Sequence, residues 1–263
     1  MQSGKMRVTV LGCGTSTGVP LIHCSCKVCR SRNPKNKRLR ASIWVEVDGL
    51  SLLVDVSPDF RQQALRARIP AIDAILLTHP HADHIGGLDE IRSYNYIQNK
   101  VIPAYGHEWS LRELPARFPY LFSGEKPEGG GIAKIELRPF GLRDSGFELG
   151  GVKVIPIELD HGSQKVAGFR VGNFAYLTDC NSIPEESFQR LEGLSVLLLD
   201  CLRLDRHATH LNLEAAINYS HRIGAKRTYF THLGHDFDYV AASRKLPEKH
   251  GLAYDGQVIH VRR

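Results

Sequence analysis

The chain has 263 residues, 42% of them apolar and 24% charged, which is the composition of a soluble globular protein. No run approaches the roughly 20 apolar residues that cross a bilayer, so we expect no membrane-spanning helix. The formal net charge of +6 favours anionic substrates but is too small to indicate a nucleic-acid partner. Residues 1–7 lack the apolar core of a signal peptide, and we therefore expect a cytoplasmic protein.

The first predicted element is a strand from Arg7 to Leu11, which runs into a glycine-rich loop that ends at Pro20. The glycine spacing of this loop differs from a dinucleotide-binding fingerprint. The loop is either a long turn or a phosphate contact, in which case Ser16 and Thr17 are the candidate substrate-binding donors. The basic stretch from Lys27 to Arg40 leaves a similar choice between a solvated loop and an attraction for phosphate.

Three of the six cysteines form the cluster Cys24-x-Cys26-x-x-Cys29. In a cytoplasmic enzyme, clustered cysteines indicate metal binding more often than disulfides. Three thiolates at this spacing can surround one tetrahedral zinc ion, which needs a fourth ligand from a histidine or a distant cysteine. The adjacent His23 is sterically awkward for that position. The alternative is a chance group of free thiols.

The next predicted elements are two hairpin strands, a helix and a short buried strand, over 42–47, 52–56, 60–68 and 74–77. The turn sequence Asp48-Gly49 joins the two hairpin strands. Asp55 ends the second of them between apolar neighbours, which argues against a surface turn residue.

Thr78 to His84 follows directly and reads Thr-His-Pro-His-Ala-Asp-His. A tight loop at a strand end directs successive side chains toward one point. We therefore expect His79 and His81 to face one pocket, and Asp83 and His84 to reach a second pocket beside it. Imidazole nitrogen and carboxylate oxygen are ligands for zinc, manganese or iron. The alternative is a polar loop that is rich in histidine by chance.

Beyond this loop, the pattern predicts further helices and strands and one loop or lid. The helices are predicted at 85–99, 108–118, 185–191 and 209–223, the strands at 101–105, 147–159 (two strands), 166–171, 174–177, 196–199, 227–231 and 258–261, and the loop at 119–134. Three apolar runs each lead to a residue that can bind a metal. These residues are His161, Asp179 and His232. Buried strands that end in ligands indicate one shared edge, where loops converge on an active site.

The complete His-x-His-x-Asp-His signature and the order of the downstream residues resemble the metallo-β-lactamase fold superfamily over essentially the whole chain. The resemblance implies an α/β (α+β) fold, a four-layer αββα sandwich, and a single hydrolase domain over 1–263 with a zinc knuckle at 23–30. It implies that one metal is held by His79, His81 and His161, the other by Asp83, His84 and His232, with Asp179 bridging. Asp55 matches an aspartate that supports the ligands from behind.

Two further motifs resemble the tRNase Z-like phosphodiesterase branch of this superfamily. The first is the loop Gly-Thr-Ser-Thr-Gly-Val-Pro at 14–20. The second is the cysteine cluster, with His235 as its fourth zinc ligand, which looks like the phosphodiesterase of the carbon–phosphorus lyase pathway. His210 matches a histidine near the scissile phosphate, and its alternative is a histidine in a helix-capping loop. Cys180 and Cys201 are expected to be packed small residues, because no activating base is evident.

The resemblance implies a metal-dependent phosphodiesterase for a small substrate, such as a cyclic ribosyl or nucleotide phosphate. Two divalent cations, Mn²⁺ or Zn²⁺, would share a bridging hydroxide, Asp83 would orient it, and His210 would either stabilise the phosphate or protonate the leaving group. A structural Zn²⁺ and a homodimer are also implied. The alternatives are a tRNA 3′-end processing endonuclease, a thioester or lactone hydrolase, and a non-catalytic binding module. The absence of a long arm that grips tRNA disfavours nucleic acid as the substrate.

Overall fold

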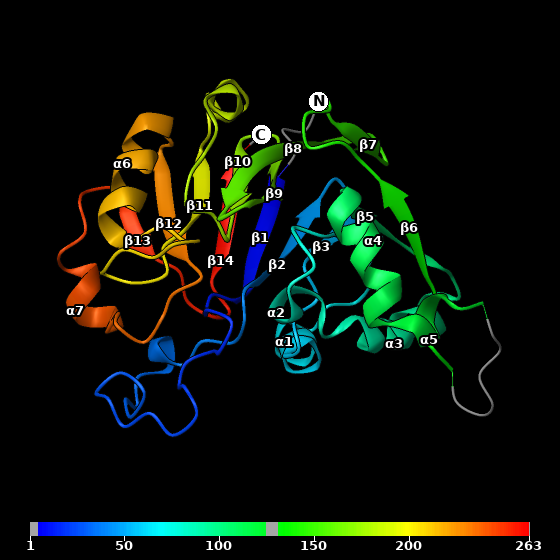
Figure 1. Cartoon of the computed structure of the whole chain (residues 1–263), viewed down its shortest axis with the longest axis horizontal. Coiled ribbons are helices and arrows are strands. Elements are labelled where there is room, and N and C mark those ends of the chain that lie inside the picture. Colours follow the sequence, from blue (N-terminus) through cyan, green and yellow to red (C-terminus); the bar gives the residue numbers. More distant parts are fainter. Residues whose placement is uncertain (1–4, 125–130, 263) are drawn as a thin grey trace.

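The computed structural model describes residues 5–124 and 131–262, in which two seven-stranded sheets lie face to face (Figure 1). In spatial order, the first sheet holds β14 (Val258–Arg262), β1 (Lys5–Gly12), β2 (Ser42–Val47), β3 (Leu50–Val54), β4 (Ala74–Leu76), β5 (Ile102–Gly106) and β6 (Ile135–Pro139). The second holds β13 (His250–Leu252), β12 (Arg227–Thr231), β11 (Val196–Asp200), β10 (Phe174–Leu177), β9 (Gln164–Val171), β8 (Val152–His161) and β7 (Phe147–Leu149).

Helices cover the outer face of each sheet (Figure 1). On the side of the first sheet lie α1 (Phe60–Ala67), α2 (Ala82–Ile85), α3 (Arg92–Gln98), α4 (Glu108–Arg117) and α5 (Pro119–Phe122), and on the side of the second lie α6 (Leu213–Ile223) and α7 (Tyr239–Ser243). Within residues 5–124 and 131–262 there are three 3-10 helices: η1 (Pro34–Asn36), η2 (Leu88–Ile91) and η3 (Glu185–Leu191). The predicted four-layer αββα sandwich is therefore confirmed.

Two large clusters of buried apolar side chains form the core of the described residues, and the alternation of side chains along β3 divides that strand between them. Leu52 and Val54 join the larger cluster, whereas Leu53 joins the cluster under the helices of the first sheet. Leu159 and Leu198 of the second sheet belong to the larger cluster, which also includes Ala216 and Ile223 of α6. Both sheets thus bury apolar side chains against each other, which brings their edges together.

Parallel pairing aligns the strand ends that carry the predicted ligands. In the first sheet β3, β4, β5 and β6 are successively parallel, and in the second β10, β11, β12 and β13 are parallel. Since β8 is antiparallel to β9 and β9 to β10, β8 runs in the same direction as β10. The carboxyl ends of these strands consequently meet at common edges, as the pattern of apolar runs predicted.

The predicted single helix over 85–99 is wrong, because the chain there divides into α2, η2 and α3. Gly86 and Gly87 lie so close to residues 57–58 that a Cβ on Gly87 would meet the carbonyl oxygen of Ser57 at 2.1 Å. This close approach interrupts the helix after Ile85. The pattern also missed β6 and β13, while α5 occupies part of the predicted loop at 119–134, of which 125–130 lie outside the described residues. No helix in the described ranges is long and apolar enough to cross a membrane.

Candidate metal centre and active site

Three predicted site residues have the same unusual backbone conformation at the ends of strands. Asp55, Asp179 and His232 follow the ends of β3, β10 and β12, and their φ angles are 60°, 54° and 58°. This left-handed region is uncommon for residues other than glycine and costs of order 1–3 kcal/mol for each residue. Its occurrence at three strand ends shows that the fold constrains these side chains where the two sheets meet.

One group of candidate ligands consists of three histidines from two sheets. The ligand atoms of His79, His81 and His161 lie within 4.8 Å of one another. Nε2 of His79 is 2.9 Å from Nδ1 of His81, and His79 is completely buried. The structure thus brings together the residues that the resemblance assigns to one metal.

The second group combines carboxylates with imidazoles. Nε2 of His84 lies 3.2 Å from Asp83 and 3.3 Å from Asp179, and Nε2 of His232 lies 3.3 Å from Asp179. Asp179 is also 3.7 Å from Nε2 of His79, so its carboxylate lies between the two groups. Burial by itself would raise the pKa of Asp83, but His84 and His232 beside it hold that pKa well below its usual range. Asp83 is therefore an ionised carboxylate.

The chemistry of this donor set fits divalent cations. Within the described part of the chain, Nε2 of His84 and both ring nitrogens of His232 are buried and make no hydrogen bond, although carboxylate oxygens lie 3.2 to 3.8 Å away. Leaving a buried polar atom unpaired costs about 1–3 kcal/mol, and coordination of a cation would remove that cost. Imidazole nitrogens and carboxylate oxygens at this spacing are ligands that Zn²⁺ and Mn²⁺ accept.

Two buried carboxylates hold the candidate ligands from behind. Asp55 accepts hydrogen bonds from the backbone N–H and the hydroxyl of Thr78, at 2.9 and 2.7 Å, and lies 2.7 Å from Nδ1 of His84. Asp200 accepts from the backbone N–H of Asp179 at 3.1 Å and lies 3.2 Å from Nδ1 of His210. Such partners fix the orientation of a metal-binding ring. The resemblance implies this role for Asp55, whereas the role of Asp200 was missed, although Asp200 also ends an apolar run.

His210 lies at the border of the second group. Its ring is stacked on that of His232 with the centroids 4.8 Å apart, and its Nε2 is 3.9 Å from Asp179. Burial by itself would lower the pKa of His210, but the negative charge of Asp200 and its hydrogen bond to the ring raise it to about 9. The structure therefore places an imidazole with a raised pKa where the resemblance expects a group near the scissile phosphate.

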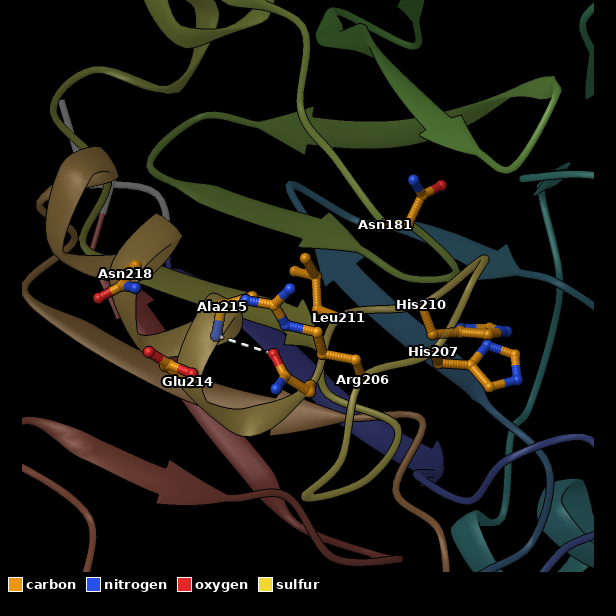
Figure 2. A pocket seen from close by; sticks show the side chains of 9 residues that line it. Asn181, Arg206, His207, His210, Leu211, Glu214, Ala215 and Asn218 are labelled. Carbon is orange, nitrogen blue, oxygen red and sulfur yellow. Dashed lines mark hydrogen bonds between the residues drawn. The ribbon is translucent and has the colours of Figure 1, made fainter.

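A polar hollow of about 290 Å³ opens beside His210 (Figure 2). Figure 2 shows the Arg206 side chain extending from its loop toward Ala215 of α6, whereas the rings of His207 and His210 point the other way. The backbone carbonyl of Arg206 accepts a hydrogen bond of 2.6 Å from the guanidinium of Arg203, which fixes the loop. No motif in the sequence indicated that Arg206 lines this hollow, because its position depends on how the loop folds against α6.

The cysteine cluster meets His235, as the resemblance implies. The sulfur atoms of Cys24, Cys26 and Cys29 lie 3.3, 3.6 and 3.6 Å from Nδ1 of His235. Tetrahedral zinc with bonds of ~2.3 Å to sulfur and ~2.0 Å to nitrogen separates these atoms by about 3.6 Å. The four side chains therefore fit one structural zinc ion.

The arginine at position 38 supports the segment that carries both His232 and His235. Arg38 is fully buried and donates hydrogen bonds to the carbonyls of Gly234 and Phe237, at 2.9 and 2.6 Å. The segment that follows β12 carries a candidate ligand of the metal centre, His232, and the ligand of the cysteine cluster, His235.

The two predicted phosphate donors of the glycine-rich loop lie elsewhere. Ser16 and Thr17 are exposed, and the Thr17 hydroxyl donates to the carbonyl of Gly18 at 3.3 Å. Thr17 lines a separate hollow with His235 and Arg203, not the hollow beside His210. Their role in substrate binding stays a prediction.

Comparison with known proteins identifies relatives of this chain. Residues 51–233 match the model of the beta-lactamase superfamily domain. A protein of Porphyromonas gingivalis (strain ATCC BAA-308 / W83) named octanoyltransferase is 37% identical over 233 residues, which cover 88% of this chain. The match covers 46% of that protein, so the chain spans about half the length of this relative.

Two solved structures superpose closely on the chain. A diphosphatase from the PhnP family has a TM-score of 0.91 and 42% identity, with 98% of this chain and 97% of that chain covered. Zn²⁺-bound PqqB from Methylobacterium extorquens has a TM-score of 0.77 and 21% identity, with 96% and 99% covered, and shares the fold. The chain therefore belongs to the metallo-β-lactamase superfamily, within its PhnP-like group of metal-dependent hydrolases.

Proposed function

We propose that this hydrolase is a phosphodiesterase whose substrate phosphate binds across the two groups of metal-ligating side chains. The observation that carries the proposal is the position of His210. Asp200 orients this imidazole, and its free nitrogen faces Asp179, which lies between the two groups. A protonated group next to cation sites suits the departure of an alkoxide from phosphorus. The 42% identity to a diphosphatase supports phosphorus chemistry.

Two divalent cations would occupy the centre in this proposal. His79, His81 and His161 would hold one, Asp83, His84 and His232 would hold the other, and Asp179 would contact both. Mn²⁺ and Zn²⁺ both suit these ligands. When bound, such cations lower the pKa of water and neutralise charge on the phosphate oxygens.

The side chains of the protein supply the remaining steps. Asp83 accepts a hydrogen bond from the attacking water and directs its oxygen toward phosphorus. As the new P–O bond forms, the bond to the leaving oxygen breaks, and its electron pair stays on that oxygen. His210 gives its Nε2 proton to the leaving oxygen, and the proton lost by the water passes to solvent, from which His210 is protonated again. The hollow beside His210 gives the leaving group room to depart.

A second candidate is hydrolysis of a diphosphate, which the name of the PhnP-family relative favours. The same arrangement serves this reaction, because water again attacks phosphorus and His210 again protonates an oxygen. The bond that breaks is then a P–O–P anhydride. The two candidates differ in the group that enters the hollow beside His210.

Hydrolysis of bis(p-nitrophenyl) phosphate by the full chain, loaded with Mn²⁺ or with Zn²⁺, tests the proposal. We expect turnover that Asp179→Ala abolishes. A nucleoside diphosphate, a precursor tRNA and a thioester, assayed in parallel, distinguish the competing functions. Turnover of the thioester alone by a metal-loaded protein would overturn the proposal.

A further inference from the structure

Trp109 forms an aromatic wall on the side of the metal centre formed by the three histidines. Its ring centroid lies 5.6 Å from that of His81, at an interplanar angle of 86°, and 6.2 Å from that of His79. Trp109 belongs to the first turn of α4 and is only partly buried, so part of the indole is accessible. The steps of hydrolysis described above do not use this side chain.

A hollow of about 570 Å³ opens along Trp109, larger than the hollow beside His210. His107, Trp109 and Phe140 line it, with ring centroids 6.3 Å apart for both the His107–Trp109 and the His107–Phe140 pairs. The side chains of Ser163 and Gln164 add polar groups to the lining. An aromatic wall with a few hydrogen-bonding groups is typical of sites for planar heterocycles.

The cations around this hollow have carboxylate partners. The guanidinium of Arg143 donates two hydrogen bonds to Glu158, at 2.7 and 3.1 Å. Lys165 pairs with Asp160 and lies 3.4 Å from Glu158.

Arg112, the third cation, lies 3.9 Å from Glu108, a long and exposed pair. In the described ranges, by contrast, no carboxylate lies within 4.0 Å of the Arg206 guanidinium in the hollow beside His210. The hollow along Trp109 therefore suits a neutral group better than a second phosphate.

We propose that Trp109 is a specificity-determining residue, and that the hollow beside it holds the nucleobase of a nucleotide phosphodiester. The base stacks on the indole and belongs to the ester group that remains on phosphorus. The leaving group departs on the opposite side, toward His210. This inference rests on the proposed phosphodiesterase function and deepens it, because it names a nucleotide as the retained group. A nucleoside monophosphate is then the retained product.

Product inhibition separates the contribution of the base from that of the sugar and phosphate. The metal-loaded full chain hydrolyses bis(p-nitrophenyl) phosphate in the presence of adenosine 5′-monophosphate or ribose 5-phosphate. We expect both to inhibit competitively, and the nucleotide to bind at least about tenfold more tightly, since stacking on an aromatic ring stabilises each base. Trp109→Ala should raise the inhibition constant of the nucleotide about 5- to 150-fold and that of ribose 5-phosphate less than threefold. Trp109→Phe should retain most of the difference between the inhibition constants of the nucleotide and of ribose 5-phosphate.

Tyr96→Ala is the matched control, because Tyr96 is an exposed aromatic residue of α3 that does not line the hollow. It should leave both inhibition constants unchanged. Equal inhibition by the two compounds, or an equal effect of Trp109→Ala on both, would overturn the inference. Calorimetric titration of both compounds into the metal-loaded protein reads the base preference without turnover. Failure of the phosphodiesterase function is thus distinguishable from failure of this subsite.

Discussion

The carboxylate of Asp200 and the imidazole of His210 lie 3.2 Å apart, and the same carboxylate accepts the backbone N–H groups of Asp179 and Leu211. One fully buried side chain therefore positions both the candidate proton donor and the aspartate between the two metal-ligand groups. The orientation of His210 consequently depends on the end of β11 as well as on its own loop.

Replacement of His210 tests its role as proton donor. We expect His210→Ala to retain its bound metals but to lose turnover of a phosphodiester with an alkoxide leaving group by about 10²–10⁴-fold, the usual contribution of a general acid. Metal analysis of the purified protein and steady-state kinetics check this result. The exposed His260→Ala on β14 is the control and should have normal activity. Retained turnover in His210→Ala would sink the assignment.

Asp200→Asn should lower kcat about 10- to 100-fold, because the amide removes the charge that stabilises a protonated His210. The asparagine side chain retains one oxygen, so one of the two backbone N–H groups that Oδ1 and Oδ2 of Asp200 accept loses its acceptor, and circular dichroism of the variant checks that the fold persists. In a double-mutant cycle, the variant that carries both Asp200→Asn and His210→Ala should be no slower than His210→Ala alone. Such non-additivity is typical of residues that act as a unit. Asp205→Asn in the exposed loop is the control. Independent, additive effects would show that Asp200 does not act through His210.

Asp55→Asn should weaken metal binding by about 10- to 100-fold, because Asp55 orients His84 through a contact of 2.7 Å. Competition with a chelator, followed by metal analysis, measures the affinity. Asp89→Asn, on the surface of η2, should bind metal normally. An unchanged affinity in Asp55→Asn would mean that the fold alone holds His84 in place.

Cys24→Ser should reduce the zinc content by one ion per chain and lower the unfolding temperature, because the four-ligand site contributes to folding. Elemental analysis and thermal denaturation measure the two effects. Cys201→Ala, which changes a buried cysteine away from the cluster, should keep the full zinc content. A normal zinc content in Cys24→Ser would rule out the proposed site.

Arg38→Met should destabilise the protein by about 1–3 kcal/mol for each carbonyl that loses its partner, Gly234 and Phe237. The free energy of unfolding in urea measures this loss. Since these carbonyls flank His235, the variant should also release zinc more readily to a chelator. Arg61→Met at an exposed position of α1 should match the wild type in both measurements. Equal stability of the two variants would contradict the supporting role of Arg38.

Local patterns in the sequence predicted most of the elements and much of the site. The hairpin of β2 and β3 follows from its two short apolar runs and from Asp48-Gly49, both at positive φ as a tight hairpin turn requires. The loop of His79 to His84 is recognisable because its ligands lie within six residues. His161, Asp179 and His232 were identifiable because each lies at or just beyond the end of an apolar strand. These features depend on residues that are close together in the sequence, so they can be recognised from a single sequence.

Only the tertiary structure decided the features that join distant segments. Cys24 meets His235 across 211 residues, and Arg38 reaches Gly234 across 196. The break at Gly86 and Gly87 depends on the backbone of residues 57–58, and the place of Trp109 depends on how α4 packs beside the three histidines. The sequence by itself predicted the candidate metal ligands and His210. The packing of the two sheets decided their partners and the hollows around them, because contacts between distant residues leave no periodic signal in the chain.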